Sequence, residues 1–172
     1  TGVGMVATAF SMGFHLSNNR YDLAVNLEIA GAFDRNLVLG ETVKVSEDFF
    51  AELGAEDGED FLPIDKLGFG HSRMTPLEPE IQLPTFKLAK AITVSRVHGN
   101  ETTIYNTMSR LHPQIESMEG AAFIYSCNQV KLPSIQLRAI SNYVERRNRS
   151  SWNIDLAVTN VNTAAIKILN DL

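Results

Sequence analysis

Short apolar runs with strand-like and helix-like patterns alternate along almost the whole chain of 172 residues. Strands are expected where a run is short or alternates with period two, and helices where apolar residues recur every three or four positions. The expected strands cover residues 22–27, 41–46, 89–95, 114–117 and 134–140, and the expected helices cover 5–14, 102–111, 118–130 and 153–172. This alternation predicts a single three-layer α/β/α domain over residues 1–172 with a central mixed sheet.

Composition limits the classes of partner that the chain can bind. It is 44% hydrophobic and 20% charged with a net charge of −5, so it can bury a core but offers no basic surface for nucleic acid or an anionic membrane. No apolar run approaches the roughly 20 residues of a membrane span. Cys127, the only cysteine, lies in an apolar helical run and is expected to be a core residue in a reducing compartment. We therefore expect a cytoplasmic protein that binds neither nucleic acid nor membrane.

Residues 47–86 form a long excursion between two expected strands. Acidic residues are interleaved there with phenylalanine and leucine, and four prolines occur between positions 63 and 84. Loops of this length usually bind a ligand or act as lids, and the aromatic residues favour packing on a partner subunit or a ligand. An acidic, solvated loop with a few apolar anchors is the alternative. A shorter loop is expected at residues 30–33, after the strand over 22–27.

The first residues contain two closely spaced glycines. Gly2 and Gly4 fit the loose pattern G-x-G-x-x-A of dinucleotide sites. That class of site needs an acidic residue at the end of the second strand, whereas Asp22 stands at the beginning of its strand. The pattern therefore favours a tight glycine turn at a helix N-terminus near the ligand.

Two other classes of catalytic site lack their signatures. The four histidines, His15, His71, His98 and His112, show no metal-ligand spacing among themselves or with Cys127. No G-x-S-x-G motif for a nucleophilic serine occurs. We expect no metal site, and His98 is expected either to line a pocket or to lie partly exposed in a loop.

An acidic residue and an amide are expected at the sheet edge where open α/β sheets bind ligands. Glu119 stands at the head of the helix over 118–130, and Asn142 follows the strand over 134–140. One interpretation of Glu119 is a carboxylate that complements the helix dipole. The other is an anionic acceptor that, beside the thioether of Met118, suits a sugar with vicinal hydroxyls that becomes cationic in the transition state.

Three segments resemble the nucleoside phosphorylase and nucleosidase superfamily. They are Val25–Ala32, Met118–Ala121 and Arg138–Asn142. Within that superfamily, residues 52–58, 67–70 and 140–149 are similar to the futalosine hydrolases of the alternative menaquinone pathway. The similarity covers nearly the whole chain. It implies a nucleoside phosphorylase-like domain that is amino-terminally incomplete, because the family's first strands and its water-activating glutamate precede Thr1.

The resemblance implies a role for each residue of the site. Glu119 would bind the ribose hydroxyls, Met118 would pack on the sugar, and backbone at Val97 would contact the base. The related adenosine-type nucleosidases have an aspartate at the position matching Asn142, whose amide suits the hypoxanthine of futalosine instead. Arg147 would meet the benzoate carboxylate of the substrate, although a solvated surface arginine is the alternative.

The strand and loop over Ile29, Ala30 and Gly31 indicate which nucleophile attacks the substrate. Phosphorylases of the superfamily hold phosphate with a hydroxyl residue matching Ile29 or Ala30, so these apolar side chains imply that water attacks and that no cofactor is needed. Glu28 departs from the family, which usually has glycine there, and places an anion near the sugar pocket. The alternatives are a phosphorylase or nucleosidase acting on inosine-like substrates, or an inactive nucleoside-binding fragment. The resemblance also implies a homo-oligomer, at least a dimer.

Overall fold

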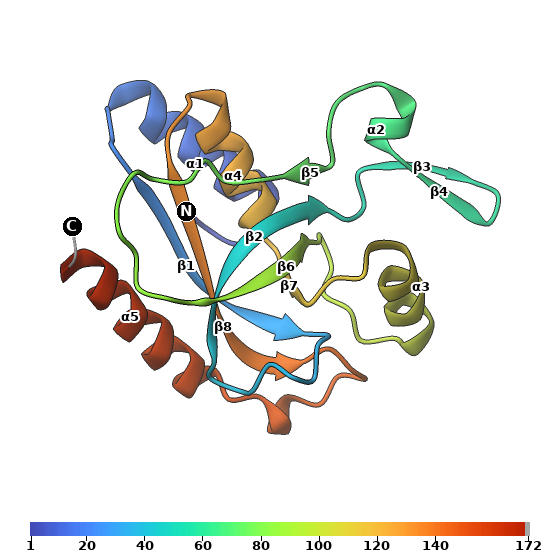
Figure 1. The fold of residues 1–172 in the computed structure, drawn as a ribbon. Helices are drawn as coiled ribbons and strands as arrows, with labels where there is room; N and C mark the ends of the chain where they lie inside the picture. The colour runs from blue at the N-terminus through green and yellow to red at the C-terminus, as the bar shows by residue number, and fades with distance from the viewer. Residues whose placement is uncertain (171–172) are drawn as a thin grey trace.

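A six-stranded mixed sheet forms the centre of the computed structural model, which describes residues 1–170 (Figure 1). Its strands are β1 (Ala24–Ala32), β2 (Thr42–Phe50), β5 (Arg73–Met74), β6 (Lys87–Thr93), β7 (Ile115–Ser117) and β8 (Ser134–Tyr143). They follow the order β5-β2-β6-β7-β1-β8, and β2 also pairs with β8. The strands β2, β6, β7, β1 and β8 thus close into a ring. Buried, mostly small side chains from these five strands pack together inside the ring.

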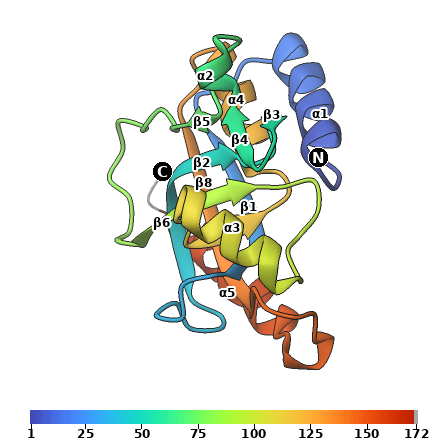
Figure 2. The same cartoon turned by 90° about the vertical axis from the view of Figure 1, so that its right-hand side faces the viewer.

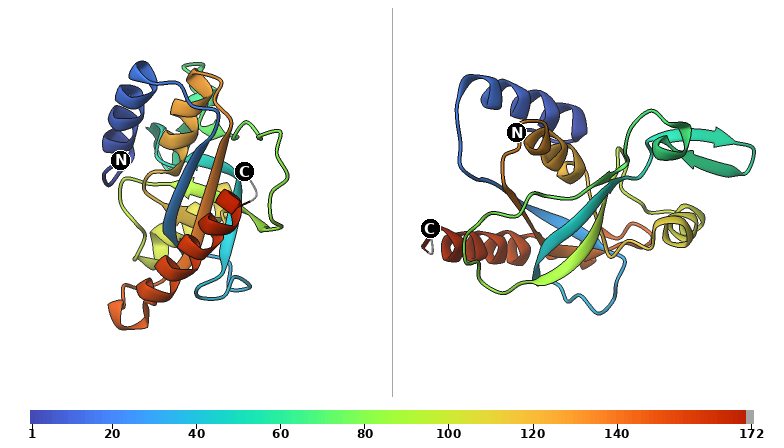
Figure 3. Two further views of the ribbon diagram at one scale, coloured as in Figure 1. Left: turned by 90° about the vertical axis from the view of Figure 1, so that its left-hand side faces the viewer. Right: turned by 45° about the horizontal axis from the view of Figure 1, so that its top comes forward.

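Helices cover two opposite sides of this ring. The helices are α1 (Met5–Asn18), α2 (Ile64–Leu67), α3 (Glu101–Leu111), α4 (Gly120–Gln129) and α5 (Ile154–Asn170), with a 3₁₀ turn at Arg149–Ser151. Figure 3 shows α1 and α4 together on one side and α5 along the other. Ile135, Leu137 and Ala139 of β8 pack in the core beneath α5, while Gln136 between them faces the start of α4. The three-layer α/β prediction is therefore confirmed.

The ends of α3 follow from local chemistry. Asn100 caps the helix, because its side-chain oxygen accepts hydrogen bonds from the backbone amides of Thr102 and Thr103. At the other end His112 adopts a left-handed conformation and Pro113 follows it, which stops the helix. The helix predicted over residues 102–111 is confirmed. The last two residues of the tail helix predicted over 153–172 lie outside the described part of the chain.

The loop predicted at residues 30–33 is wrong, because β1 continues to Ala32. Residues Ala30, Gly31 and Ala32 pair in parallel with β8, and the last two also pair antiparallel with β7. Hydrogen bonds from both neighbours therefore hold a segment whose sequence, Ala-Gly-Ala, has little strand preference of its own. By the same pairing β8 runs three residues past its predicted end, to Tyr143.

The excursion over residues 47–86 contains more regular structure than predicted. Its first residues complete β2, and a hairpin of β3 (Gly54–Asp57) and β4 (Asp60–Pro63) follows before α2 and β5. The hairpin and α3 both lie on the right-hand side in Figure 1, which is the side that faces the viewer in Figure 2. There the Arg110 guanidinium stacks over the Phe61 ring at 4.1 Å and donates to the Ala51 carbonyl. The proposed lid or partner role of this segment stays a prediction.

The core between α1, α4 and the sheet contains the single cysteine. Cys127 is fully buried among apolar side chains of α1 and α4, as predicted. Burial raises the pKa of its thiol to about 11. Among residues 1–170 no helix combines the length and the apolar character that crossing a membrane requires.

Candidate functional site

A cavity of about 360 Å³ lies beside the carboxyl-terminal parts of β1, β7 and β8. All the residues that the sequence singled out for the site line it, namely Ile29, Ala30, Gly31, Val97, Met118, Glu119, Asn142 and Arg147. These residues come from four separate stretches of the chain. The closed ring of strands brings them together, and their roles toward a ligand remain predictions.

Glu119 is held by backbone amides on both of its carboxylate oxygens. Its Oε1 accepts from the Gly4 amide at 2.8 Å and its Oε2 accepts from the Met118 amide at 2.9 Å. The residue stands at the N-cap position of α4, yet its side chain makes no capping hydrogen bond to that helix. The residue is 7% exposed. Glu119 therefore provides a buried, oriented carboxyl group at the cavity wall, and its side chain does not cap α4.

The glycine turn before α1 provides one of these amides. Gly4 has a φ of 90°, which favours glycine, and it directly precedes the first residue of α1. Val3 next to it lines the cavity. The predicted turn at a helix N-terminus is thus present beside the candidate site.

Asn142 lies near the end of β8 with its amide orientation fixed by its neighbours. The Ser141 hydroxyl lies 2.8 Å from Asn142 Oδ1, and Asn142 Nδ2 donates to the Tyr143 carbonyl at 3.1 Å. The second hydrogen of Nδ2 and a lone pair of Oδ1 remain for a ligand. The side chain can therefore both donate and accept at the cavity wall.

Gly31 permits the close packing of β1 behind Asn142. The register of β1 and β8 shifts between Ala30 and Gly31. A Cβ atom on Gly31 would lie 3.0 Å from a methyl of Val144 and 3.2 Å from Asn142 Nδ2. Any larger residue would push the amide into the cavity or away from it.

A buried arginine faces the acidic end of the cavity. Arg138 is 0% exposed, and its Nη2 lies 3.2 Å from Glu28 Oε2. Burial is the main cause that raises the pKa of Glu28 to about 7; Arg138 opposes the rise and Glu119 adds to it. The anion that the sequence placed near the sugar pocket is thus paired and only partly ionised at neutral pH.

Asp48 supports the start of α4 from behind this cluster. Its fully buried carboxylate accepts from Thr93 Oγ1 at 2.8 Å and from Gln136 Nε2 at 2.7 Å, while Thr93 Oγ1 accepts from the Ala121 amide at 2.7 Å. Burial raises the pKa of Asp48 to about 6 against these hydrogen bonds. The carboxylate therefore links β2, β6 and β8 to the helix that follows Glu119.

Sequence reasoning missed a second acid in the cavity, Glu116. Its Oε2 lies 2.5 Å from His98 Nδ1, its Oε1 accepts from the His98 amide, and His98 Nε2 lies 2.9 Å from the Thr107 hydroxyl. Both His98 and Glu116 line the cavity, so the pocket alternative for His98 is the correct one. The available signal was a carboxylate inside the predicted strand over 114–117.

At the outer rim, Arg147 sits beside the ring of Trp152. Its guanidinium carbon lies 5.0 Å from the ring centroid, and both residues line the cavity. Arg149 approaches the same ring at 6.0 Å. An aromatic surface with a cation above it can receive a planar, anionic group.

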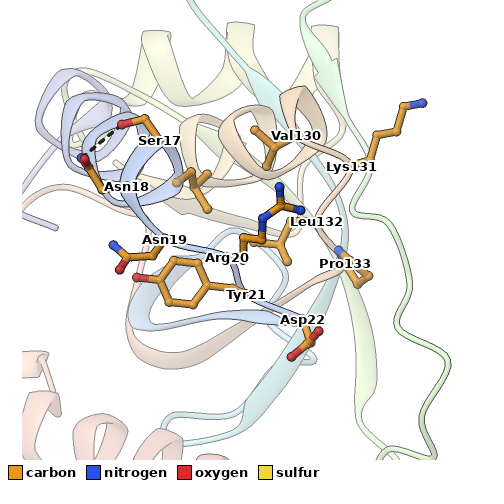
Figure 4. A pocket seen from close by; sticks show the side chains of 11 residues that line it. Ser17, Asn18, Asn19, Arg20, Tyr21, Asp22, Val130, Lys131, Leu132 and Pro133 are labelled. Carbon is orange, nitrogen blue, oxygen red and sulfur yellow. Dashed lines mark hydrogen bonds between the residues drawn. The ribbon is translucent and has the colours of Figure 1, made fainter.

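A larger hollow of about 710 Å³ lies elsewhere, between the turn after α1 and the turn before β8 (Figure 4). Polar side chains of residues 17–22 surround it, and Lys131 points away from it. It lies at the amino ends of β1 and β8 and contains none of the predicted site residues. Ligands of α/β sheets bind at the carboxyl ends of strands, so we assign the candidate site to the smaller cavity.

Among residues 1–170, no group of three or more histidine, cysteine, aspartate or glutamate side chains is placed to hold a metal ion. The charged and polar side chains that line the cavity include carboxylates, amides, His98 and Arg147. Such a set can bind a polyhydroxylated ring and read the edge of a heterocyclic base.

Comparison with known proteins relates the chain to nucleoside-cleaving enzymes. It is 29% identical to the futalosine hydrolase of Thermus thermophilus, over 98% of this chain and 79% of that protein. It is 31% identical to the futalosine hydrolase of Streptomyces coelicolor, over 89% of this chain and 67% of that protein. No protein-family model matches the chain.

The fold is shared with a solved nucleosidase. A 5′-methylthioadenosine/S-adenosylhomocysteine nucleosidase from Colwellia psychrerythraea, crystallised with adenine, superposes with a TM-score of 0.80. The match has 22% identity and covers 99% of this chain and 76% of that chain. The identity is low, so this likeness concerns the fold alone.

Proposed function

The chain belongs to the futalosine hydrolase family of N-glycosyl hydrolases, and from that premise we propose that it cleaves futalosine into hypoxanthine and dehypoxanthine futalosine. The reaction would serve menaquinone biosynthesis. One observation carries the proposal: Glu119 and Asn142 line the same cavity, with a sugar-binding carboxylate and a base-reading amide on its walls. We assign the catalytic roles to these two residues.

At the ribose end, Glu119 accepts hydrogen bonds from the sugar hydroxyls. Cleavage of the glycosidic bond develops positive charge on the ribosyl ring, and a fixed, buried anion stabilises that charge in the transition state. The amides of Gly4 and Met118 hold the carboxylate in place before substrate arrives. Met118 packs its thioether on the sugar face.

At the base end, Asn142 donates to N7 or O6 of the 6-oxopurine and accepts from a neighbouring donor. Backbone at Val97 contacts the same base. A site built for one hydrogen-bond pattern rejects the other, because a mismatched base leaves buried polar groups unpaired. Asparagine therefore favours hypoxanthine over adenine as the leaving group.

Water is the proposed nucleophile. Ile29 and Ala30, where a phosphorylase of the superfamily would carry a phosphate-binding hydroxyl, line the cavity without offering a side-chain hydroxyl. Arg138 lies in an ion pair with Glu28. These features support hydrolysis over phosphorolysis, and the proposed reaction uses no cofactor.

Arg147 at the rim is proposed to bind the benzoate carboxylate of futalosine. Its place beside Trp152 supports this role, because the ring stacks on an aryl group while the guanidinium pairs with the carboxylate. We also propose that the protein is cytoplasmic and forms a homo-oligomer, at least a dimer. Exposed apolar residues on α1, among them Val6 and Phe10, support association of subunits through that helix.

Hypoxanthine release from futalosine and from inosine, each with and without phosphate, tests the function. We expect rapid, phosphate-independent release from futalosine and slow release from inosine. Phosphate-dependent release from inosine would replace the proposal with a phosphorylase. Hypoxanthine binding in calorimetry without turnover of either nucleoside would identify a binding protein.

A further inference from the structure

Glu28 faces the interior of the site. It pairs with Arg138 across the parallel strands β1 and β8, and their side chains form the ion pair described above. Leu27 and Ile29 on either side of Glu28 pack toward α5, so Glu28 points to the opposite side, where Glu119 lies. Its side chain is 28% exposed and lines the cavity. An acid that lines the cavity beside a second acid needs a chemical explanation.

The charges around Glu28 do not balance if every acid is ionised. Arg138 from β8 is the cation of the cluster, and it faces the carboxylates of Glu28, Asp48 and Glu119. Asn26, two residues before Glu28 on β1, acts with Arg138 to lower the pKa of Glu28. One buried cation cannot neutralise three buried anions, so the cluster favours states in which protons remain on carboxylates.

Of these three carboxyl groups, Glu28 is the one best placed to hold a proton. Each of the two carboxylate oxygens of Glu119 already accepts a hydrogen bond from a backbone amide. Asp48 accepts two side-chain hydrogen bonds and lies behind the cavity. Glu28 is more exposed than either and can exchange its proton with water in the cavity.

We propose that Glu28 is a second sugar-facing carboxylate of the ribose end, which holds a proton beside Glu119 and supports cleavage of the nucleoside best after it has lost that proton to solvent. The inference rests on the proposed function. When Glu28 releases its proton to solvent, a second anion faces the sugar, and the ribosyl cation of the transition state is stabilised further. The protonated form of Glu28 instead donates a hydrogen bond to an acceptor in the cavity. Of the two carboxyl groups, only Glu119 then binds the sugar as an anion.

The direction of the pKa change agrees with this role. The pKa of Glu28 is raised to about 7 by burial and by Glu119, with Arg138 acting in the opposite direction. The ionised fraction of such a group increases about tenfold between pH 6 and pH 8. We therefore expect kcat/KM for futalosine to rise about tenfold over the same range.

Two independent measurements test the proposal on the full chain. In carboxyl ¹³C NMR of glutamate-labelled protein, the signal lost in Glu28→Gln identifies Glu28, and its midpoint is expected near pH 7. Glu119→Gln should lower that midpoint, because a neighbouring like charge is removed. A midpoint below about 5, or no change on removing Glu119, would overturn the inference. This measurement needs no substrate, so it decides the state of Glu28 even if no nucleoside is cleaved.

The kinetic measurement compares pH profiles of kcat/KM. Wild type and the control Glu78→Gln, an exposed acid paired with Lys44, should show the rise across pH 7. Glu28→Gln should show a flat profile in that range. Glu28→Gly, which removes the whole side chain, should flatten the profile as well, and it serves as the second variant if Glu28→Gln does not fold. A rise that persists in either folded variant excludes Glu28 as its cause.

Discussion

Glu119 and Gly4 are joined by a 2.8 Å hydrogen bond between the carboxylate and the backbone amide, although 115 residues separate them in the chain. The bond places the acid of α4 at the amino end of α1. Backbone amides at that position carry partial positive charge and attract a carboxylate. The orientation of the proposed sugar-binding group therefore depends on a turn in a distant part of the sequence.

Replacement of Glu119 by glutamine should abolish most activity and leave the fold intact. The amide keeps the shape of the side chain but removes the anion that stabilises the ribosyl cation. We expect kcat/KM for futalosine to fall by about 10²-fold or more, with an unchanged circular dichroism spectrum. Glu78→Gln, which removes one exposed negative charge, serves as the control. Wild-type turnover in the glutamine variant would remove Glu119 from the mechanism.

Replacement of Asn142 by aspartate should change which base leaves. A carboxyl group accepts from a 6-amino group and can protonate N7, whereas it repels the oxygen of a 6-oxopurine. We expect the preference for futalosine over its 6-amino analogue to drop by about 10²-fold, measured as the ratio of kcat/KM values. Ser141→Ala removes the hydroxyl that contacts Asn142 Oδ1 and the Ala30 carbonyl, and it should lower rates for both substrates and preserve the ratio. An unchanged ratio in the aspartate variant means that Asn142 does not discriminate between the two bases.

A methyl group on Gly31 should damage both stability and substrate binding. It would lie 3.0 Å from Val144 and 3.2 Å from Asn142 Nδ2, so the strand or the amide must move. We expect Gly31→Ala to lower the free energy of unfolding by about 1–3 kcal/mol and to raise KM for futalosine. Gly13→Ala is the matched control, because a Cβ there meets nothing within 4 Å on helix α1. That change should stabilise the protein by about 0.5–1 kcal/mol. Equal stability changes in the two variants would contradict the close packing at Gly31.

Local pattern predicted the places of Glu119 and Asn142, whereas Val97 and Arg147 were predicted through the family resemblance. Glu119 and Asn142 stand just before a helix and near the end of a strand, and both positions follow from apolar periodicity. The extension of β1 through Gly31 could not be predicted in this way. It depends on hydrogen bonds from β7 and β8, which lie far away in the sequence.

Buried charged residues are the second kind of feature that the sequence pattern did not predict. Asp48 stands in an acidic stretch that indicates a solvated surface, yet Thr93 and Gln136 surround it with donors in the core. The Glu116 and His98 pair joins residues 18 positions apart in sequence. Burying a carboxylate inside a protein costs free energy unless partners of this kind surround it. The sequence alone does not show which hydrogen-bond donors the fold brings to the carboxylate.

Asp48 should make stability depend on pH with a definite sign. Its pKa in the folded protein is raised from 3.8 to about 6, so the folded state holds the proton more tightly than the unfolded state. The resulting stabilisation is complete below pH 3.8 and is lost as the pH rises through about 6. Asp48→Asn removes this titration, and its amide can still be satisfied, because Gln136 Oε1 has no hydrogen-bond partner among the described residues and can accept after a flip. Urea unfolding from pH 4 to pH 7 should therefore show an extra fall of roughly 2–4 kcal/mol in wild type relative to Asp48→Asn. Parallel pH profiles of the two proteins would mean that Asp48 is ionised throughout this range.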